Sequence, residues 1–161
     1  MGRAMQFKEF TLSKLLLLII TSTITLTFIS LYAEAEEQSP QQQIQTLIST
    51  IYDKPNLKVE TSPIVIVDEY AVADWLQGER GGRALLQRIK GKWTIMACGA
   101  NGLKDVKTLT EAGIPRPTAK SIVSKLTNEE KAIDSHRLHL FSLFGTKDDP
   151  MQMDHHEHHN H

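Results

Sequence analysis

The N-terminal part of the chain has the hydrophobic pattern of an export signal. A basic start is followed by an uncharged apolar run, Leu15–Leu31, and then by the small-residue pattern Ala33-Glu34-Ala35. These are the three parts of a secretory signal peptide. The apolar run is short for a spanning helix, although an uncleaved membrane anchor is the alternative. We expect residues 1–35 to be removed, with cleavage after Ala35 or after Ala33, and the protein to reach the bacterial periplasm or the cell exterior.

A change of period separates a first helix from a sheet. Apolar residues first recur at the spacing of one helical face, at Ile44, Leu47, Ile48 and Ile51. This helix is expected to begin near Pro40, since proline fits a first helical turn, and to end before Pro55. Runs rich in β-branched, apolar and aromatic residues follow, with glycines between them: Ile64–Val67, Tyr70–Leu76, Arg83–Ile89 and Trp93–Cys98. Their short separation predicts a four-stranded antiparallel meander.

Two glycine-containing segments are expected to be the turns of this meander. Lys90-Gly91-Lys92 is a plausible tight turn, and the segment Gln77–Arg83 is expected to form a hairpin whose glycines supply positive φ. The second segment superficially resembles a phosphate-binding loop. It lacks the lysine and the strand-to-helix context of such a loop, so we interpret it as a hairpin.

The helical period returns after the sheet. The sequence predicts a helix through Leu103 and Leu109 that stops before Pro115, a second helix over Thr118–Leu126, and a third helix opened by a T-x-x-E capping box at Thr127. Gly145 is expected to end the third helix. The predicted fold class is α+β, with the helices on one face of a small antiparallel sheet. By analogy alone, a helix against a curved meander also allows a cystatin-like or NTF2-like sheet.

The pattern divides the chain into three parts: a signal peptide at 1–35, a single α+β domain at 36–146, and a polar tail at 147–161 expected to be disordered. The formal net charge of −1 and the pI near 6.7 argue against a nucleic-acid partner. After signal cleavage we expect no membrane span. No Ser-His-Asp arrangement or carboxylate pair stands out, so we do not expect an enzyme.

The tail carries most of the candidate chemistry. Its thioether and imidazole side chains are candidate metal ligands: Met151, Met153, His155, His156, His158, His159 and His161. Imidazole binds copper(II), zinc and nickel, whereas thioether is a soft ligand for copper(I). Both types side by side favour copper in either oxidation state, with zinc or nickel as the alternative. An expression tag is a further alternative, although Glu157 and Asn160 interrupt the histidines.

The body adds a few candidates. Cys98, the chain's single cysteine, lies two residues after Met96 on a predicted strand, so the two would share a face and form a soft copper(I) pair. The alternative is that both fill the core. His136 and His139 are three residues apart on the third predicted helix, as a ligand pair or as an ordinary surface pair.

The segment Tyr70–Gly113, with a signal peptide before it and a His/Met tail after it, resembles a known family, the small exported bacterial proteins described as copper uptake system-associated proteins. The resemblance rests on Trp75, Gln77-Gly78, Gly81-Gly82-Arg83-Ala84-Leu85-Leu86, Gly91, Trp93, Cys98, Leu103 and Ala112-Gly113. It implies a periplasmic role in copper acquisition and no catalytic mechanism. The resemblance includes Cys98 by its position in the sequence, and it does not imply that this cysteine binds metal.

Together these features predict an exported metal-binding accessory protein. The tail would capture copper, and the folded domain would dock to a membrane transporter or receptor of a copper uptake system. One alternative is a zinc or nickel scavenger of the same layout. Another is a binding module for a small molecule or peptide, in which the tail is incidental.

Overall fold

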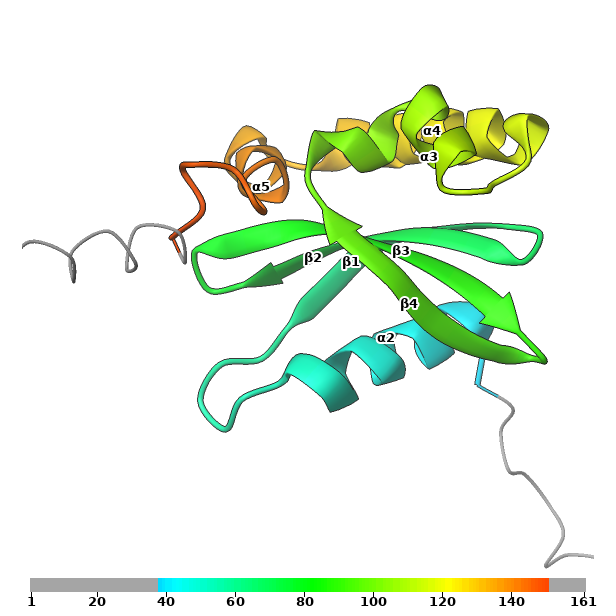
Figure 1. The fold of residues 1–161 in the computed structure, drawn as a ribbon. Coiled ribbons are helices and arrows are strands. Elements are labelled where there is room, and N and C mark those ends of the chain that lie inside the picture. Colours follow the sequence, from blue (N-terminus) through cyan, green and yellow to red (C-terminus); the bar gives the residue numbers. More distant parts are fainter. Residues whose placement is uncertain (1–37, 151–161) are drawn as a thin grey trace, which may run out of the picture. The chain divides into compact units, whose positions relative to one another are not determined.

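In the computed structural model, which describes residues 38–150, helix α2 (Pro40–Tyr52) begins and ends as the sequence predicts (Figure 1). Its start is a capping box, because the Ser39 hydroxyl accepts from the Gln42 amide and the Gln42 side chain accepts from the Ser39 amide at 2.8 Å. Ile44 and Ile48 are buried, whereas Ile51 is 54 % exposed. The predicted apolar face therefore packs through its first two turns only.

The four strands form the predicted antiparallel meander. Strands β1 (Glu60–Val67), β2 (Tyr70–Gln77), β3 (Arg80–Ile89) and β4 (Lys92–Gly99) lie in the order β1-β2-β3-β4. Lys90 and Gly91 have φ of 51° and 78°, which is the backbone of a two-residue type I′ turn. Gly78, with φ of 63°, turns the chain between β2 and β3. The α+β fold class and both predicted hairpins are confirmed.

Helices cover both faces of the sheet, so the prediction of helices on one face is wrong (Figure 1). Helix α2 packs on one face through Ile44 and Ile48, against residues of the sheet that include Ala71, Ala73, Ala84 and Leu86. The C-terminal helices pack on the other face, against Val65, Val72 and Leu85. Consecutive positions of β2 and β3 are buried because each face has its own cover.

The C-terminal half divides into short helices: η2 (Asn101–Lys104), α3 (Val106–Glu111), α4 (Arg116–Glu129), η3 (Glu130–Ala132) and α5 (Ser135–Phe141). The predicted first helix is interrupted at Asp105, whose carboxylate accepts from the Thr108 amide at 2.8 Å and caps α3. The predicted third helix does not open at Thr127, which lies inside α4. It opens after Asp134, which accepts from the Arg137 amide at 3.0 Å.

Strand β4 ends earlier than its neighbours. Its last residue, Gly99, pairs with Arg83, so β4 has no residue opposite Arg80–Gly82. The end of α5 packs against Gly81, and the chain that follows α5 packs against Gly82. A Cβ on Gly81 would lie 2.9 Å from the backbone carbon of Leu140, and a Cβ on Gly82 would lie 2.7 Å from the Cβ of Phe144. These two glycines have no positive φ, so the prediction for them was wrong: they admit a close neighbour.

Packing continues past Thr146, where we expected the domain to end. Asp149 is 5 % exposed, and its carboxylate accepts from the Gly145 amide at 2.9 Å. Its own amide donates to the Thr146 carbonyl at 3.1 Å. Within residues 38–150 no helix has the length and apolar content needed to span a membrane.

Candidate functional site

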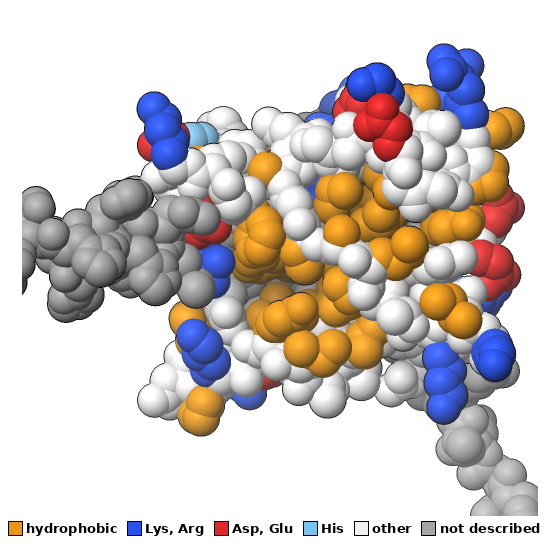
Figure 2. Space-filling view, viewed as in Figure 1, with side chains coloured by type: hydrophobic (Ala, Val, Ile, Leu, Met, Phe, Trp, Pro, Cys, Tyr) orange, Lys and Arg blue, Asp and Glu red, His pale blue; other side chains and the backbone are white. Residues whose placement is uncertain are grey.

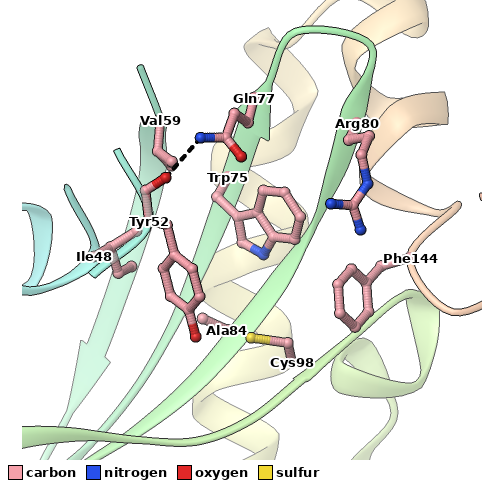
Figure 3. A pocket seen from close by; sticks show the side chains of 9 residues that line it. All are labelled: Ile48, Tyr52, Val59, Trp75, Gln77, Arg80, Ala84, Cys98 and Phe144. Atoms are coloured by element: carbon pink, nitrogen blue, oxygen red, sulfur yellow. Dashed lines mark hydrogen bonds between the residues drawn. The ribbon is translucent and has the colours of Figure 1, made fainter. Parts of the chain in front are cut away.

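A pocket lies on the α2 side of the sheet, near the end where β2 and β3 extend beyond β4 (Figure 3). Helix α2, the chain before β1, strands β2 to β4 and the segment after α5 all line it. Its residues are Ile48 and Tyr52 from α2; Val59; Trp75 and Gln77 from β2; Arg80 and Ala84 from β3; Cys98 from β4; and Phe144. Figure 2, viewed as Figure 1, shows hydrophobic side chains gathered around a hollow in the middle of the molecule. The pocket therefore joins residues that are far apart in the sequence.

The volume of this pocket, about 120 Å³, limits what it can hold. Sites for drug-sized ligands usually enclose about 300–1,000 Å³, whereas a single benzene ring is held by an apolar cavity of about 150 Å³. One side chain or one small ligand fits, and a large organic cofactor does not. A wider and more open hollow of about 530 Å³ lies beside the β1 edge, between α2 and α4.

Cys98 presents its sulfur to this pocket. It pairs with Ala84 across the sheet and belongs to the partly buried layer under α2. Burial raises the pKa of the Cys98 thiol above its usual value, and a hydrogen bond with the Tyr52 hydroxyl opposes that shift. Burial likewise raises the pKa of Tyr52, with a smaller contribution from Cys98. Both groups are therefore protonated near neutral pH when the pocket is empty.

A β-bulge separates Cys98 from Met96. Ile95 pairs with Leu86 and Ala97 pairs with Leu85, so Met96 is the extra residue of β4. The alternation of faces is interrupted there, and Cys98 packs on the same side as Ile95. Met96 is 44 % exposed and does not line the pocket. The structure therefore does not bring Met96 and Cys98 together as the predicted soft pair.

Two polar side chains of the pocket differ in their hydrogen bonding: Trp75 has an unused donor, whereas the Gln77 amide donates twice. The indole nitrogen of Trp75 is enclosed and has no acceptor among the described residues. Gln77 is 9 % exposed, and its Nε2 donates to the carbonyls of Tyr52 at 2.8 Å and Leu57 at 3.1 Å (Figure 3). Gln77 thus fixes the end of α2 against β2. An enclosed donor without a partner costs about 1–3 kcal/mol, so an acceptor placed in the pocket would relieve that cost.

The rim of the pocket holds the start of the tail. Arg80 Nε lies 3.2 Å from Asp149 Oδ1, and the Asp149 side chain is 6 % exposed. No local sequence pattern predicts this contact, since the two residues are 69 positions apart. The chain is therefore fixed beside the pocket two residues before Met151.

The predicted ligands of the tail, Met151 through His161, lie outside the described residues, as does the predicted signal peptide. His136 and His139 are both exposed on α5, as in the ordinary interpretation of a surface pair. Between residues 38 and 150 no group of three or more His, Cys, Asp or Glu side chains is arranged to hold a metal ion. Of the predicted copper ligands, those of the tail are not described, whereas Cys98 is described and lines the pocket.

A buried charged cluster, which sequence reasoning missed, lies on the opposite face of the same strands. It consists of Asp74, Arg83, Glu130 and Lys104. Arg83, 1 % exposed, places Nη2 at 2.6 Å from Glu130, while Lys104 pairs with the other Glu130 oxygen. Nη1 of Arg83 donates to the Phe141 carbonyl at 3.1 Å. Arg83 therefore ties the sheet to the C-terminal helices.

Asp74 is the unusual member of this charged cluster. It is fully buried, and its oxygens accept no aligned hydrogen bond from a described residue, although Arg83 Nε lies 3.2 Å away. Burial raises the pKa of Asp74 to about 8 against the opposing effect of Arg83, and nearby Glu130 adds to the rise. The pKa of Glu130 is lowered, because its contacts with Lys104 and Arg83 outweigh its burial. Near neutral pH the folded state therefore favours a protonated Asp74 beside an ionised Glu130.

Comparisons with known protein families, with curated proteins and with solved structures find no match to this chain.

Proposed function

We propose that this protein is an exported copper-binding accessory protein. The tail Met151–His161 captures copper, and the folded domain carries it to a membrane transporter or receptor of a copper uptake system. The observation that carries the proposal is the contact between Arg80 and Asp149, at 3.2 Å. It holds Asp149, two residues before the ligand-rich segment, beside a pocket that contains a thiol.

The residue types of the tail support copper over other ions. Methionine sulfur prefers copper(I), and imidazole accepts copper(II), so one segment serves both oxidation states. Zinc and nickel have little use for thioether ligands. A zinc or nickel scavenger would bind through the histidines alone, and replacing Met151 and Met153 by leucine would leave its affinity unchanged.

The pocket weighs against the alternative of a general small-molecule module. Its volume of about 120 Å³ holds no more than one small ring, and its half-buried thiol has no role in binding an ordinary apolar ligand. The resemblance to copper uptake system-associated proteins, carried by Trp75, Cys98 and the Gly81–Leu86 segment, supports the same proposal.

Calorimetric titration with copper(I), copper(II), zinc and nickel tests the proposal. The structure sets the truncation point: a chain ending at Pro150 keeps the contact of Asp149 with Arg80 and removes every predicted tail ligand. We expect this truncation to lower copper affinity by at least tenfold. The control replaces His136 and His139, which are exposed on α5, by glutamine and should bind copper like the parent. Unchanged copper affinity after truncation would refute the proposal.

A further inference from the structure

We infer that the free edge of β1, at Ile64–Ile66, binds an extended peptide segment of a partner protein, which adds to the sheet as a further strand beside β1. The segment lies between α2 and α4, which pack on opposite faces of the sheet (Figure 1). In strand addition, main-chain hydrogen bonds give affinity and alternate side chains give specificity. The inference concerns the folded domain and goes beyond the proposed function, because it does not depend on copper binding by the tail.

The pairing of β1 with β2 determines which backbone groups of β1 face outward. Val67 pairs with Tyr70 across a two-residue loop, so this closing pair is hydrogen-bonded. Hydrogen-bonded and non-hydrogen-bonded pairs alternate along an antiparallel ladder, so Val65 also bonds to β2. Ile64 and Ile66 therefore direct their N–H and C=O groups away from β2. Among the described residues, no backbone hydrogen bond outside the ladder involves either of them.

Other parts of the two sheet edges carry features that block pairing. Earlier in β1, Pro63 has no N–H, and the ladder with β2 is irregular beside it. The opposite edge strand, β4, begins with Lys92 and contains the bulge at Met96. Charged residues, prolines and bulges are common protections of an edge strand. Ile64–Ile66 has none of them, so this part of the described sheet is best suited to accept another strand.

The hollow of about 530 Å³ lies where that strand would lie, about 4.8 Å from β1. Its walls are Gln41 in the first turn of α2, and Ser124, Lys125, Asn128 and Glu129 of α4. A second copy of the domain would bring its own α2 and α4 to the same place, and the helices would meet before the two edges could pair. A single extended segment avoids this collision, so the occupant is a peptide rather than a second copy.

The two faces of the edge specify the side chains of the segment. Residues opposite each other in neighbouring strands place their side chains on the same face of the sheet. Ile64 and Ile66 are half-buried on the α2 face, so the residues opposite them are apolar. Val65 packs on the α4 face, so the residue opposite it meets the polar wall between Ser124 and Glu129 and is polar. The segment therefore alternates apolar, polar and apolar residues.

Selection from a phage-displayed library of random octapeptides on the mature full-length protein, with a metal chelator present, tests this site. We expect the selected peptides to share the alternating pattern. A synthetic copy of one should slow hydrogen exchange of the Ile64 and Ile66 amides at least tenfold, and that of Val65 much less, because Val65 already bonds to β2. A selection without binders, or binders that protect neither amide, would overturn the inference.

Variants of the protein and of the peptide test the geometry without changing the sheet. Asn128→Trp fills the hollow and should lower peptide affinity at least tenfold, whereas Thr127→Trp, an exposed position of α4 outside the hollow, should not. N-methylation of the peptide residues opposite Ile64 and Ile66 should abolish binding. N-methylation of the residue between them should not, because its amide faces away from β1. Equal affinities within either pair would refute strand addition at this edge.

Two further measurements separate this inference from its alternatives. Analytical ultracentrifugation should show a monomer, and a dimer that Asn128→Trp dissociates would overturn the choice of a peptide over a second copy. Truncation after Pro150, which tests the proposed function, should leave peptide binding unchanged. Loss of peptide binding with copper affinity intact would therefore refute the edge site alone, and unchanged copper affinity after truncation would refute the proposed function alone.

Discussion

The two faces of β2 and β3 near their shared hairpin differ in the polar groups that they bury: charged side chains on one face and neutral ones on the other. On the side of the C-terminal helices, Arg83 meets Asp74 and Glu130 in the charged cluster, and the chain supplies the ionic partners. On the side of α2, the next residues of the same strands, Trp75 and Ala84, line the pocket with Cys98. There the Trp75 N–H has no partner among the described residues.

This difference separates a structural site from a candidate functional one. Burying a charge is costly unless it is paired, so the charged cluster is best explained as a tie between sheet and helices. The pocket has no ionic pair of this kind, and the indole N–H of Trp75 has no partner there among the described residues, so we interpret the pocket as a candidate binding site. The following changes test that division.

Breaking the charged cluster should have the largest effect on stability. Replacing Arg83 by methionine leaves Glu130 with only Lys104, removes the bond to the Phe141 carbonyl, and should cost about 3–5 kcal/mol of unfolding free energy in denaturant titrations. The matched control is Arg88→Met, which removes a pairing with Glu69 at 2.7 Å between partly exposed side chains. That change should cost about 1 kcal/mol or less. Equal losses in the two variants would show that the buried cluster is not the structural tie.

Protonation of Asp74 should make stability depend on pH. Its pKa rises from 3.8 to about 8 on folding, so between these values the folded state binds a proton that the unfolded state lacks. Stability should therefore fall as pH rises from about 5 to 8, with a slope of at most about 1.4 kcal/mol per pH unit for one proton. Asp74→Asn, which cannot ionise, should flatten this decline in denaturant titrations at several pH values. A parent protein that becomes more stable over this range would contradict the assignment.

Releasing the start of the tail should have the smallest effect on stability and a clear effect on metal binding. Arg80→Gln removes the pairing with Asp149, for which we expect a loss of about 1 kcal/mol or less, because Arg80 is partly exposed. Copper(I) affinity should fall severalfold, since the tail is no longer held beside the pocket. The control is Arg137→Gln, which removes the exposed pairing with Glu60 and should leave copper(I) affinity unchanged. If both variants bind copper(I) like the parent, anchoring by Arg80 contributes nothing to the site.

Local signals in the sequence were sufficient for the helices and turns that depend on neighbouring residues. The span of α2 followed from its proline and its apolar spacing, and the Lys90-Gly91 turn followed from the strands around it. The T-x-x-E pattern at Thr127 failed, because α4 packs against the sheet through Ile122 and Leu126 and continues over that signal. The bulge at Met96 likewise carries no mark in the sequence, and it separates a pair that strict alternation would join.

By itself, the sequence determined the α+β order of elements and the hairpins of the meander, and it shows the methionines and histidines of the tail from which we propose copper binding. Only the tertiary structure decided that helices cover both faces, that Gly81 and Gly82 admit α5 and the segment after it, and that Arg80 meets Asp149 beside the pocket. The physical reason is range. Helical spacing and turn conformations depend on residues a few positions apart, whereas the charged cluster and the pocket form between residues that only packing brings together.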